Sequence, residues 1–219
     1  MSKVYLSPSC QYDNAYAYGN TTEAVQCIKI ANACKTALER SGISVKMPSD
    51  NSLVNRCAES DKWGADLHVP IHTNAAKGHT SGTRCFAYST RGDGYRAAKA
   101  IFDVLAPITP GQSESITANK DLYEIRNTKA PCAYVECEFH DVPATSKWIV
   151  ENTTVIGEAI AKGICNYYGV AYVEAKKAEE VTTGTLYLVQ AGAFRSKKNA
   201  EALVRQLKAA GFSAIIKSR

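Results

Sequence analysis

The sequence predicts an α/β fold in which a mostly parallel sheet is flanked by helices, followed by a small C-terminal βαβ unit. Three observations predict this fold. Short apolar runs alternate with longer segments whose apolar residues recur at helical spacing, glycines such as Gly42 and Gly169 follow those segments, and the pattern restarts after a polar stretch near residue 180. Alternating strands and helices pack best as a parallel sheet covered by helices.

The longest expected helix spans residues 22–41. Its apolar residues follow the i, i+3, i+4, i+7 pattern, and Gly42 ends it. Glu23 lies in its first turn, where the helix dipole favours a carboxylate. Three further helices are expected at residues 53–62, 95–105 and 153–168.

The expected strands are short apolar runs bounded by turn residues. They cover residues 4–6, 43–46, 67–72, 83–88 and 133–137. Ligands of parallel α/β sheets bind beyond the carboxyl ends of the strands. The polar residues that follow these strands are therefore the first candidates for chemistry.

Composition divides the chain into three parts. Residues 1–170 form the first domain, residues 171–184 are rich in Lys, Glu and Thr as in a linker, and residues 185–219 form the second unit. Within that unit we expect a strand at residues 187–191, a helix at 198–210 and a strand at 213–217. So short a unit is marginally stable on its own.

The overall composition is that of an ordinary globular protein. Of the 219 residues 45% are hydrophobic and 21% charged, and the net charge of +5 suits an anionic polymer. No nucleic-acid-binding motif occurs, so we expect no nucleic acid partner. No apolar run approaches the roughly 18 residues that would span a membrane, and we expect no membrane insertion.

The eight cysteines and the first residues of the chain indicate the cellular compartment in which the protein is made. The cysteines form no C-x-x-C pair, which disfavours a structural zinc knuckle, and we expect most of them to be reduced and buried. The segment from Met1 to Pro8 has no apolar stretch of the signal-peptide kind. We therefore expect synthesis in the cytoplasm without a signal peptide.

Histidine and carboxylate side chains follow the expected strands. Glu23 begins the first helix, His72 ends the strand 67–72, Glu136 lies in the strand 133–137, and His140 comes after it. The topology brings these positions toward one edge of the sheet. Together they suit Zn²⁺, which in catalytic sites takes about three protein ligands and keeps one position open for water. A further carboxylate beside that water would act as general base.

His68 shares the face of His72 but is interpreted differently. Four residues along a strand separate the two side chains by about 13 Å, too far to share one ion. We interpret His68 as a core histidine with satisfied hydrogen bonds.

Four segments follow one another in a characteristic order: Val4-Tyr5-Leu6-Ser7-Pro8, Asn20-Thr21-Thr22-Glu23, Ile71-His72-Thr73-Asn74-Ala75 and Pro131-Cys132-Ala133-Tyr134-Val135-Glu136. In order and spacing they resemble the zinc-dependent N-acetylmuramoyl-L-alanine amidases, a family that includes many phage endolysins. The resemblance implies cleavage of the amide between N-acetylmuramic acid and L-alanine in bacterial peptidoglycan. It also implies Glu23 and His72 as zinc ligands and Glu136 as the catalytic residue.

One position departs from this family, which usually has a histidine two residues after the first-strand proline. Here that position is Cys10. Cys10 could bind zinc as a thiolate, His140 could take the vacant place with Asp141 orienting it, or the site could be degenerate and poor in metal. We take His140 as the expected third ligand and Cys10 as the alternative. A degenerate site would leave a catalytically decayed protein that only binds the cell wall.

Two further residues are candidates for holding the substrate. Arg126 precedes the strand of Glu136 and could pair with a peptide carboxylate, although a surface ion pair explains it equally well. Asn74 follows His72 in the third segment and could face the same groove.

The C-terminal unit contains Tyr187-Leu188-Val189-Gln190-Ala191-Gly192-Ala193-Phe194, which resembles the start of a SPOR domain. That family binds glycan strands that lack stem peptides. A complete SPOR domain has two strand-helix-strand units, and only one fits here. We therefore expect either cell-wall binding or a homodimer in which two half-domains restore the missing symmetry. Taken together, the features predict a bacteriolytic endolysin that acts on the cell wall after release.

Overall fold

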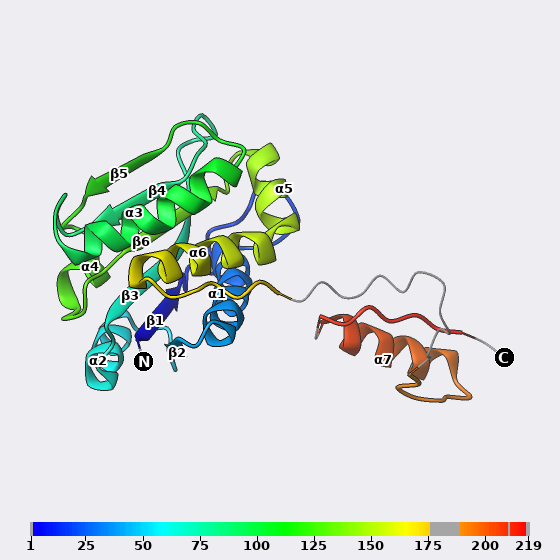
Figure 1. Ribbon diagram of the computed structural model, residues 1–219. Coiled ribbons are helices and arrows are strands. Elements are labelled where there is room, and N and C mark those ends of the chain that lie inside the picture. Colours follow the sequence, from blue (N-terminus) through cyan, green and yellow to red (C-terminus); the bar gives the residue numbers. More distant parts are fainter. Residues whose placement is uncertain (1, 176–188, 210, 218–219) are drawn as a thin grey trace. The chain divides into compact units, whose positions relative to one another are not determined.

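The computed structural model describes residues 2–175, 189–209 and 211–217 (Figure 1). The chain divides into two compact units, Met1–Ala175 and Lys176–Arg219. Within the described residues, no helix is both long and apolar enough to span a membrane.

The first unit is built on one six-stranded sheet with the order β2-β1-β3-β6-β4-β5. Its strands are β1 (Lys3–Pro8), β2 (Ser44–Lys46), β3 (Leu67–Asn74), β4 (Arg84–Ala87), β5 (Ser115–Ala118) and β6 (Tyr134–Phe139). All neighbouring strands run parallel except β4 and β6, which pair antiparallel. The predicted α/β fold with a mostly parallel sheet is confirmed.

Helices cover the sheet on both faces. They are α1 (Glu23–Arg40), α2 (Leu53–Trp63), α3 (Asp93–Leu105), α4 (Tyr123–Asn127), α5 (Pro143–Glu151) and α6 (Thr153–Tyr168), with a 3-10 turn η1 (Ala106–Ile108). In Figure 1, α1, α3 and α6 lie together along the sheet, and the main apolar core fills the space beneath them. Strand residues such as Leu6, Ile71 and Val135 point into this core and are fully buried.

The opposite face of the sheet carries polar side chains and is covered in part by α2 and α4. Tyr5 on β1 donates a hydrogen bond to Glu59 of α2 at 2.8 Å. His68 on β3 contacts Ser60 of α2 and Glu124 of α4. Because side chains alternate along a strand, the residues next to the apolar core positions all face this second, polar side.

All nine helices and strands predicted for the first unit are present, with ends that differ by at most two residues, but β5, α4, α5 and the 3-10 turn η1 were not predicted. Each of these four has nine residues or fewer, which is too short for a hydrophobic period to distinguish it from a loop. The cysteines behave as expected, since all eight are free and only Cys10 is not buried.

The second unit differs from the prediction at its strands. The expected helix is present as α7 (Lys197–Ala209). Residues 189–191 and 213–217, expected to be strands, form none, and Val189 and Ile215 are 95% and 87% exposed. A strand is held by hydrogen bonds to a neighbouring strand, and neither segment has one within the described part of this unit. Residues 187–188 and most of the expected linker lie outside the described residues.

Helix α6 packs against its two neighbours through glycines. A Cβ atom on Gly157 would lie 2.5 Å from the Ile30 carbonyl oxygen of α1, and one on Gly163 would lie 2.5 Å from the Ile101 Cα of α3. These helices therefore approach closely enough that no side chain fits between them.

Gly157→Ala is expected to destabilise the protein, although alanine favours a helix by about 1 kcal/mol over glycine. Overpacking against the α1 backbone should outweigh this gain and lower the free energy of unfolding by roughly 1–3 kcal/mol. Urea unfolding measures the change. Thr154→Ala, at an exposed position of the same helix, serves as the control. A Gly157→Ala variant as stable as the parent would contradict this description of the α1–α6 contact.

Candidate functional site

The candidate site lies on the polar face of the sheet, where β3 and β6 run side by side. His72 of β3 and Glu136 of β6 are partners in the register of these strands. The ring of His72 stacks on Tyr134, with 4.7 Å between the ring centroids. Strand alternation thus sets a histidine, a carboxylate and an aromatic ring side by side.

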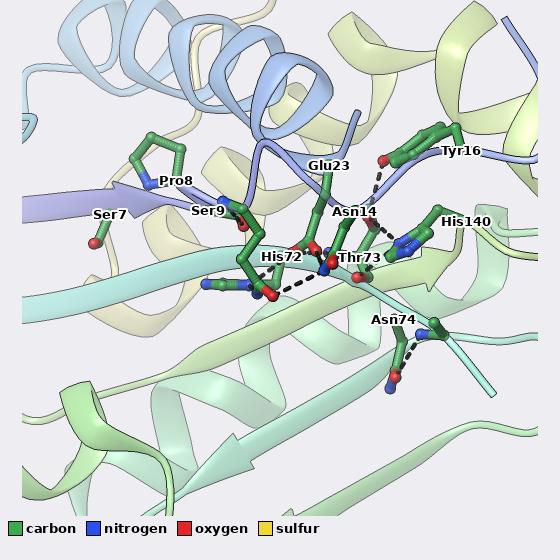
Figure 2. Close-up of polar contacts among 12 residues, drawn as sticks. Ser7, Pro8, Ser9, Asn14, Tyr16, Glu23, His72, Thr73, Asn74 and His140 are labelled. Carbon is green, nitrogen blue, oxygen red and sulfur yellow. Dashed lines mark hydrogen bonds and ion pairs between the residues drawn. The ribbon is translucent and has the colours of Figure 1, made fainter. Parts of the chain in front are cut away.

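Glu23 reaches this face from the first residue of α1. One of its carboxylate oxygens, Oε1, lies 2.8 Å from His72 Nδ1, and the other accepts a hydrogen bond from Asn14 Nδ2 at 2.7 Å. Figure 2 shows these three side chains converging. Glu23 and His72 are only 1% and 7% exposed. The start of a helix is a favourable place for a buried carboxylate, because unpaired N–H groups and the helix dipole stabilise negative charge there.

The two partners stabilise each other's charged forms. Burial opposes ionisation of Glu23, but the hydrogen bond and charge of His72, with the Asn14 amide, hold the pKa of this carboxyl below its usual value. Burial likewise opposes protonation of His72, but the bond to Glu23 and the charges of Glu136 and Glu23 raise the pKa of His72. The contact thus favours the charged form of each partner, and it joins the start of α1 to β3.

Glu136 stands beside this pair without a partner of its own. Its Oε2 is buried and accepts no hydrogen bond among the described residues. Burial raises the pKa of Glu136 to about 7, an effect that the nearby His72 opposes and the charge of Glu23 reinforces. A carboxyl that titrates near neutral pH and has a free oxygen can both accept and release a proton, as a general acid–base requires.

The loop after β1 contributes Gln11 and Asn14, two residues to which the sequence analysis assigned no role. Gln11 Nε2 lies 3.4 Å from His72 Nδ1, and Gln11 Oε1 accepts a hydrogen bond from Asn14 Nδ2 at 2.8 Å. The loop is fixed to the start of α1, since Glu23 N donates to Asn14 O and Ala24 N donates to Gln11 O. Their position directly after the first strand was the available signal, but amide side chains were not considered as ligands.

The two residues expected to supply the third zinc ligand lie elsewhere. Cys10 Sγ donates a hydrogen bond to the Asn51 carbonyl oxygen at 3.4 Å. His140 Nδ1 lies 2.9 Å from Thr73 Oγ1 and 3.0 Å from the Thr73 carbonyl oxygen. Figure 2 shows His140 beside Thr73 and Tyr16, and its ring stacks on Tyr16.

The reason for this placement is strand alternation. Thr73 follows His72 directly on β3, so its side chain points to the opposite face of the sheet and holds His140 there. The structure therefore brings Glu23, His72 and Glu136 together, and it brings neither Cys10 nor His140 to them. Within the described residues, no three His, Cys, Asp or Glu side chains are placed to hold a metal ion.

The two candidate substrate residues are placed differently from each other. Asn74 ends β3 and its Oδ1 accepts a hydrogen bond from Ala75 N at 2.8 Å. Arg126 is exposed on α4 and lines a hollow of about 360 Å³, together with the basic side chains of Arg91 and Lys129. This hollow borders the loop before β6, and none of Glu23, His72 and Glu136 lines it.

A second histidine–glutamate pair lies deeper on the same face of the sheet. His68 Nδ1 is 3.0 Å from Ser60 Oγ, and His68 Nε2 is 3.0 Å from Glu124 Oε1. The same Glu124 oxygen accepts a hydrogen bond from Ser7 Oγ. His68 is fully buried and both of its ring nitrogens have partners, which confirms its interpretation as a core histidine.

Comparison with known proteins gives two family matches. A family model described as N-acetylmuramoyl-L-alanine amidase matches residues 10–166, and a SPOR domain model matches residues 171–219. The sporulation-specific N-acetylmuramoyl-L-alanine amidase of Bacillus subtilis (strain 168) is 26% identical over 225 residues, covering 99% of this chain and 84% of the relative. N-acetylmuramoyl-L-alanine amidase CwlM of Bacillus licheniformis is also 26% identical, covering 99% of this chain and 85% of its own length.

Solved structures share the fold of the first unit. The catalytic domain of CwlV, an N-acetylmuramoyl-L-alanine amidase from Bacillus (Paenibacillus) polymyxa var. colistinus, matches with a TM-score of 0.69 and 20% identity, covering 78% of this chain and 100% of that chain. The catalytic domain of the endolysin CD27L, which targets Clostridia difficile, matches with a TM-score of 0.61 and 19% identity, covering 76% and 98%. At these identities the likeness concerns the fold alone.

His68→Ala is expected to lower the free energy of unfolding by roughly 3–5 kcal/mol, because it leaves the buried Glu124 carboxylate with the Ser7 hydroxyl but without its histidine partner. Chemical denaturation measures the loss, and His79→Ala, at an exposed histidine, is the matched control. The double variant His68→Ala/Glu124→Ala should lose less than the sum of the single variants, because the two residues are coupled. Strict additivity would show that the pair does not act as one unit.

Proposed function

The chain belongs to the N-acetylmuramoyl-L-alanine amidase family, and on that premise we propose that the amide between N-acetylmuramic acid and L-alanine in peptidoglycan is hydrolysed at the Glu23–His72–Glu136 site with the help of a zinc ion. The observation that carries this proposal is the unpaired Glu136 oxygen beside a buried histidine–carboxylate pair. A buried polar atom without a hydrogen-bond partner destabilises the folded protein, so its presence at this site points to a functional role.

Two side chains at this site are suitable ligands for a zinc ion. Glu23 would offer a carboxylate oxygen and His72 its Nδ1, two donor types that zinc prefers. When bound there, zinc would lower the pKa of a coordinated water and polarise the carbonyl group of the scissile amide. Asn14 would hold the ligand Glu23 in place, because it donates a hydrogen bond to the second carboxylate oxygen of Glu23.

Glu136 would carry the proton through the reaction. With its pKa near 7, its carboxylate form accepts the proton of the attacking water, and the resulting acid donates that proton to the leaving amine of L-alanine. Tyr134, stacked on His72, keeps the imidazole ring beside Glu136 during the exchange.

Glu136→Gln is expected to reduce turnover by about 10²- to 10⁴-fold, because an amide cannot act as the base. Zinc content should stay unchanged, since Glu136 is assigned as base and not as ligand. The measurements are release of L-alanine amino termini from purified peptidoglycan and elemental analysis of the protein. Glu151→Gln, at an exposed glutamate, is the control. Loss of zinc in Glu136→Gln would make Glu136 a ligand, and unchanged turnover would remove its role as base.

For the C-terminal unit, we propose that it holds the enzyme on the glycan strands of the wall and that two copies pair. The SPOR match supports wall binding. Pairing is supported by apolar side chains that α7 leaves uncovered, among them Val189, Phe212 and Ile215. Burying such side chains against a second copy would provide the partner that the expected strands lack. The endolysin type and the release of the protein to the wall stay predictions.

If two copies pair in this way, sedimentation equilibrium of the full chain should give the mass of a dimer. Ile215→Asp should give a monomer, because it places a charge among the apolar side chains. Val155→Asp, which introduces the same charge at an exposed valine of α6, should leave the dimer intact. A monomeric parent chain would contradict pairing while leaving the proposal of wall binding in place.

A further inference from the structure

The zinc site proposed above has two evident ligands, and the structure offers a third donor that is neither histidine nor cysteine. Gln11, from the loop after β1, lies against the Glu23–His72 pair. We propose that the side-chain oxygen of Gln11 is the third donor to the metal and replaces the histidine that the family usually carries. This inference rests on the proposed zinc site.

The spacing of the donor atoms supports this role. Zinc bonds to oxygen and nitrogen of about 2.0–2.1 Å, arranged tetrahedrally, place neighbouring donors about 3.3–3.4 Å apart. The Gln11 carboxamide lies 3.4 Å from His72 Nδ1. The Glu23 oxygen lies closer to the same nitrogen, at 2.8 Å, as a direct hydrogen bond requires. Metal binding would therefore lengthen one contact by about half an ångström and leave the other unchanged.

The carboxamide must turn to present its oxygen. In the structure Gln11 Nε2 faces His72, while Oε1 accepts a hydrogen bond from Asn14. A half-turn about the last side-chain torsion exchanges the two atoms, and this torsion is broad and roughly two-fold in glutamine. Gln11 would give up the Asn14 bond in exchange for the metal. Asn14 would keep its bond to Glu23.

The backbone already places Gln11 for this role. Gln11 N donates a hydrogen bond to Ser9 Oγ at 3.2 Å, and Ala24 N donates to the Gln11 carbonyl oxygen at 3.3 Å. The loop is thus tied to the first turn of α1, the same turn that supplies Glu23. The side chain of Gln11 is exposed, so the metal would remain open to water and substrate on that side.

The donor set has a chemical consequence. One imidazole, one carboxylate and one carboxamide bind zinc less strongly than a set with two imidazoles, because a neutral carboxamide oxygen is a weak donor for this metal. A carboxylate in the same place would be a stronger donor. Gln11→Glu should therefore bind zinc more tightly than the parent, and Gln11→Leu should bind it more weakly.

Zinc affinity of the full chain, measured by competition with a chromophoric chelator, tests the inference directly. We expect Gln11→Leu to weaken zinc binding by more than about 100-fold, which exceeds the roughly 10- to 100-fold effect of residues that only orient ligands. Gln11→Glu should bind at least as tightly as the parent. Gln206→Leu, the same change on α7, and Cys10→Ser should both match the parent. Far-UV circular dichroism and thermal unfolding of each variant, recorded without metal, show whether it is folded.

Each other outcome has a definite meaning. Parent-like zinc binding in a folded Gln11→Leu variant overturns the inference and leaves the proposed function standing. Loss of zinc in Cys10→Ser overturns it in favour of the thiolate. A Gln11→Glu variant that binds more weakly than the parent also overturns it, since a carboxylate would then be out of reach of the metal. A parent chain that neither binds zinc nor hydrolyses peptidoglycan overturns the proposed function itself.

Discussion

The contact between the Glu23 carboxylate and His72 Nδ1 joins the first residue of α1 to the middle of β3, and the arrangement of the site depends on it. It requires that α1 begin at Glu23, which the hydrogen bond from Glu23 N to Asn14 O enforces. It also requires that His72 face the polar side of the sheet, because a shift of one residue in β3 would bury His72 in the apolar core and expose Thr73. The register between β3 and β6 then sets Glu136 beside the pair.

Two histidine–glutamate pairs lie on the same face of this sheet, and their surroundings indicate that one has a structural role and the other a functional role. His68 and Glu124 are closed in by Ser60 and Ser7, so their ring nitrogens and shared oxygen already have partners. His72 and Glu23 instead border an exposed glutamine and an unpaired carboxylate. A satisfied pair contributes stability and order, whereas a pair with unsatisfied neighbours can exchange its contacts for a metal ion and a substrate.

Much of this arrangement could be predicted from the sequence, because long periodic segments specify it. The helical pattern of residues 22–41 placed Glu23 at a helix start, and the short apolar runs placed His72 and Glu136 in strands whose ends were expected to meet at one edge of the sheet. His140 was expected to reach the metal site because it follows the strand of Glu136. Side chains on a strand alternate, however, and Thr73 holds His140 on the other face of the sheet. Gln11 was missed because its role depends on a loop conformation that no period encodes. The C-terminal strands were expected from the residue types of those segments, but such residues form a strand only when a neighbouring strand is available for hydrogen bonding.

We propose that the metal centre consists of Glu23, His72 and Gln11, with Glu136 as base. X-ray absorption spectroscopy at the zinc edge of the metal-loaded chain tests it most directly, because it resolves sulfur at about 2.3 Å from nitrogen and oxygen at about 2.0–2.2 Å. We expect about one zinc per chain, with only nitrogen and oxygen neighbours and the scattering of a single imidazole. A sulfur neighbour would identify Cys10 as ligand, a second imidazole would identify His140, and either result would exclude Gln11 as the third donor.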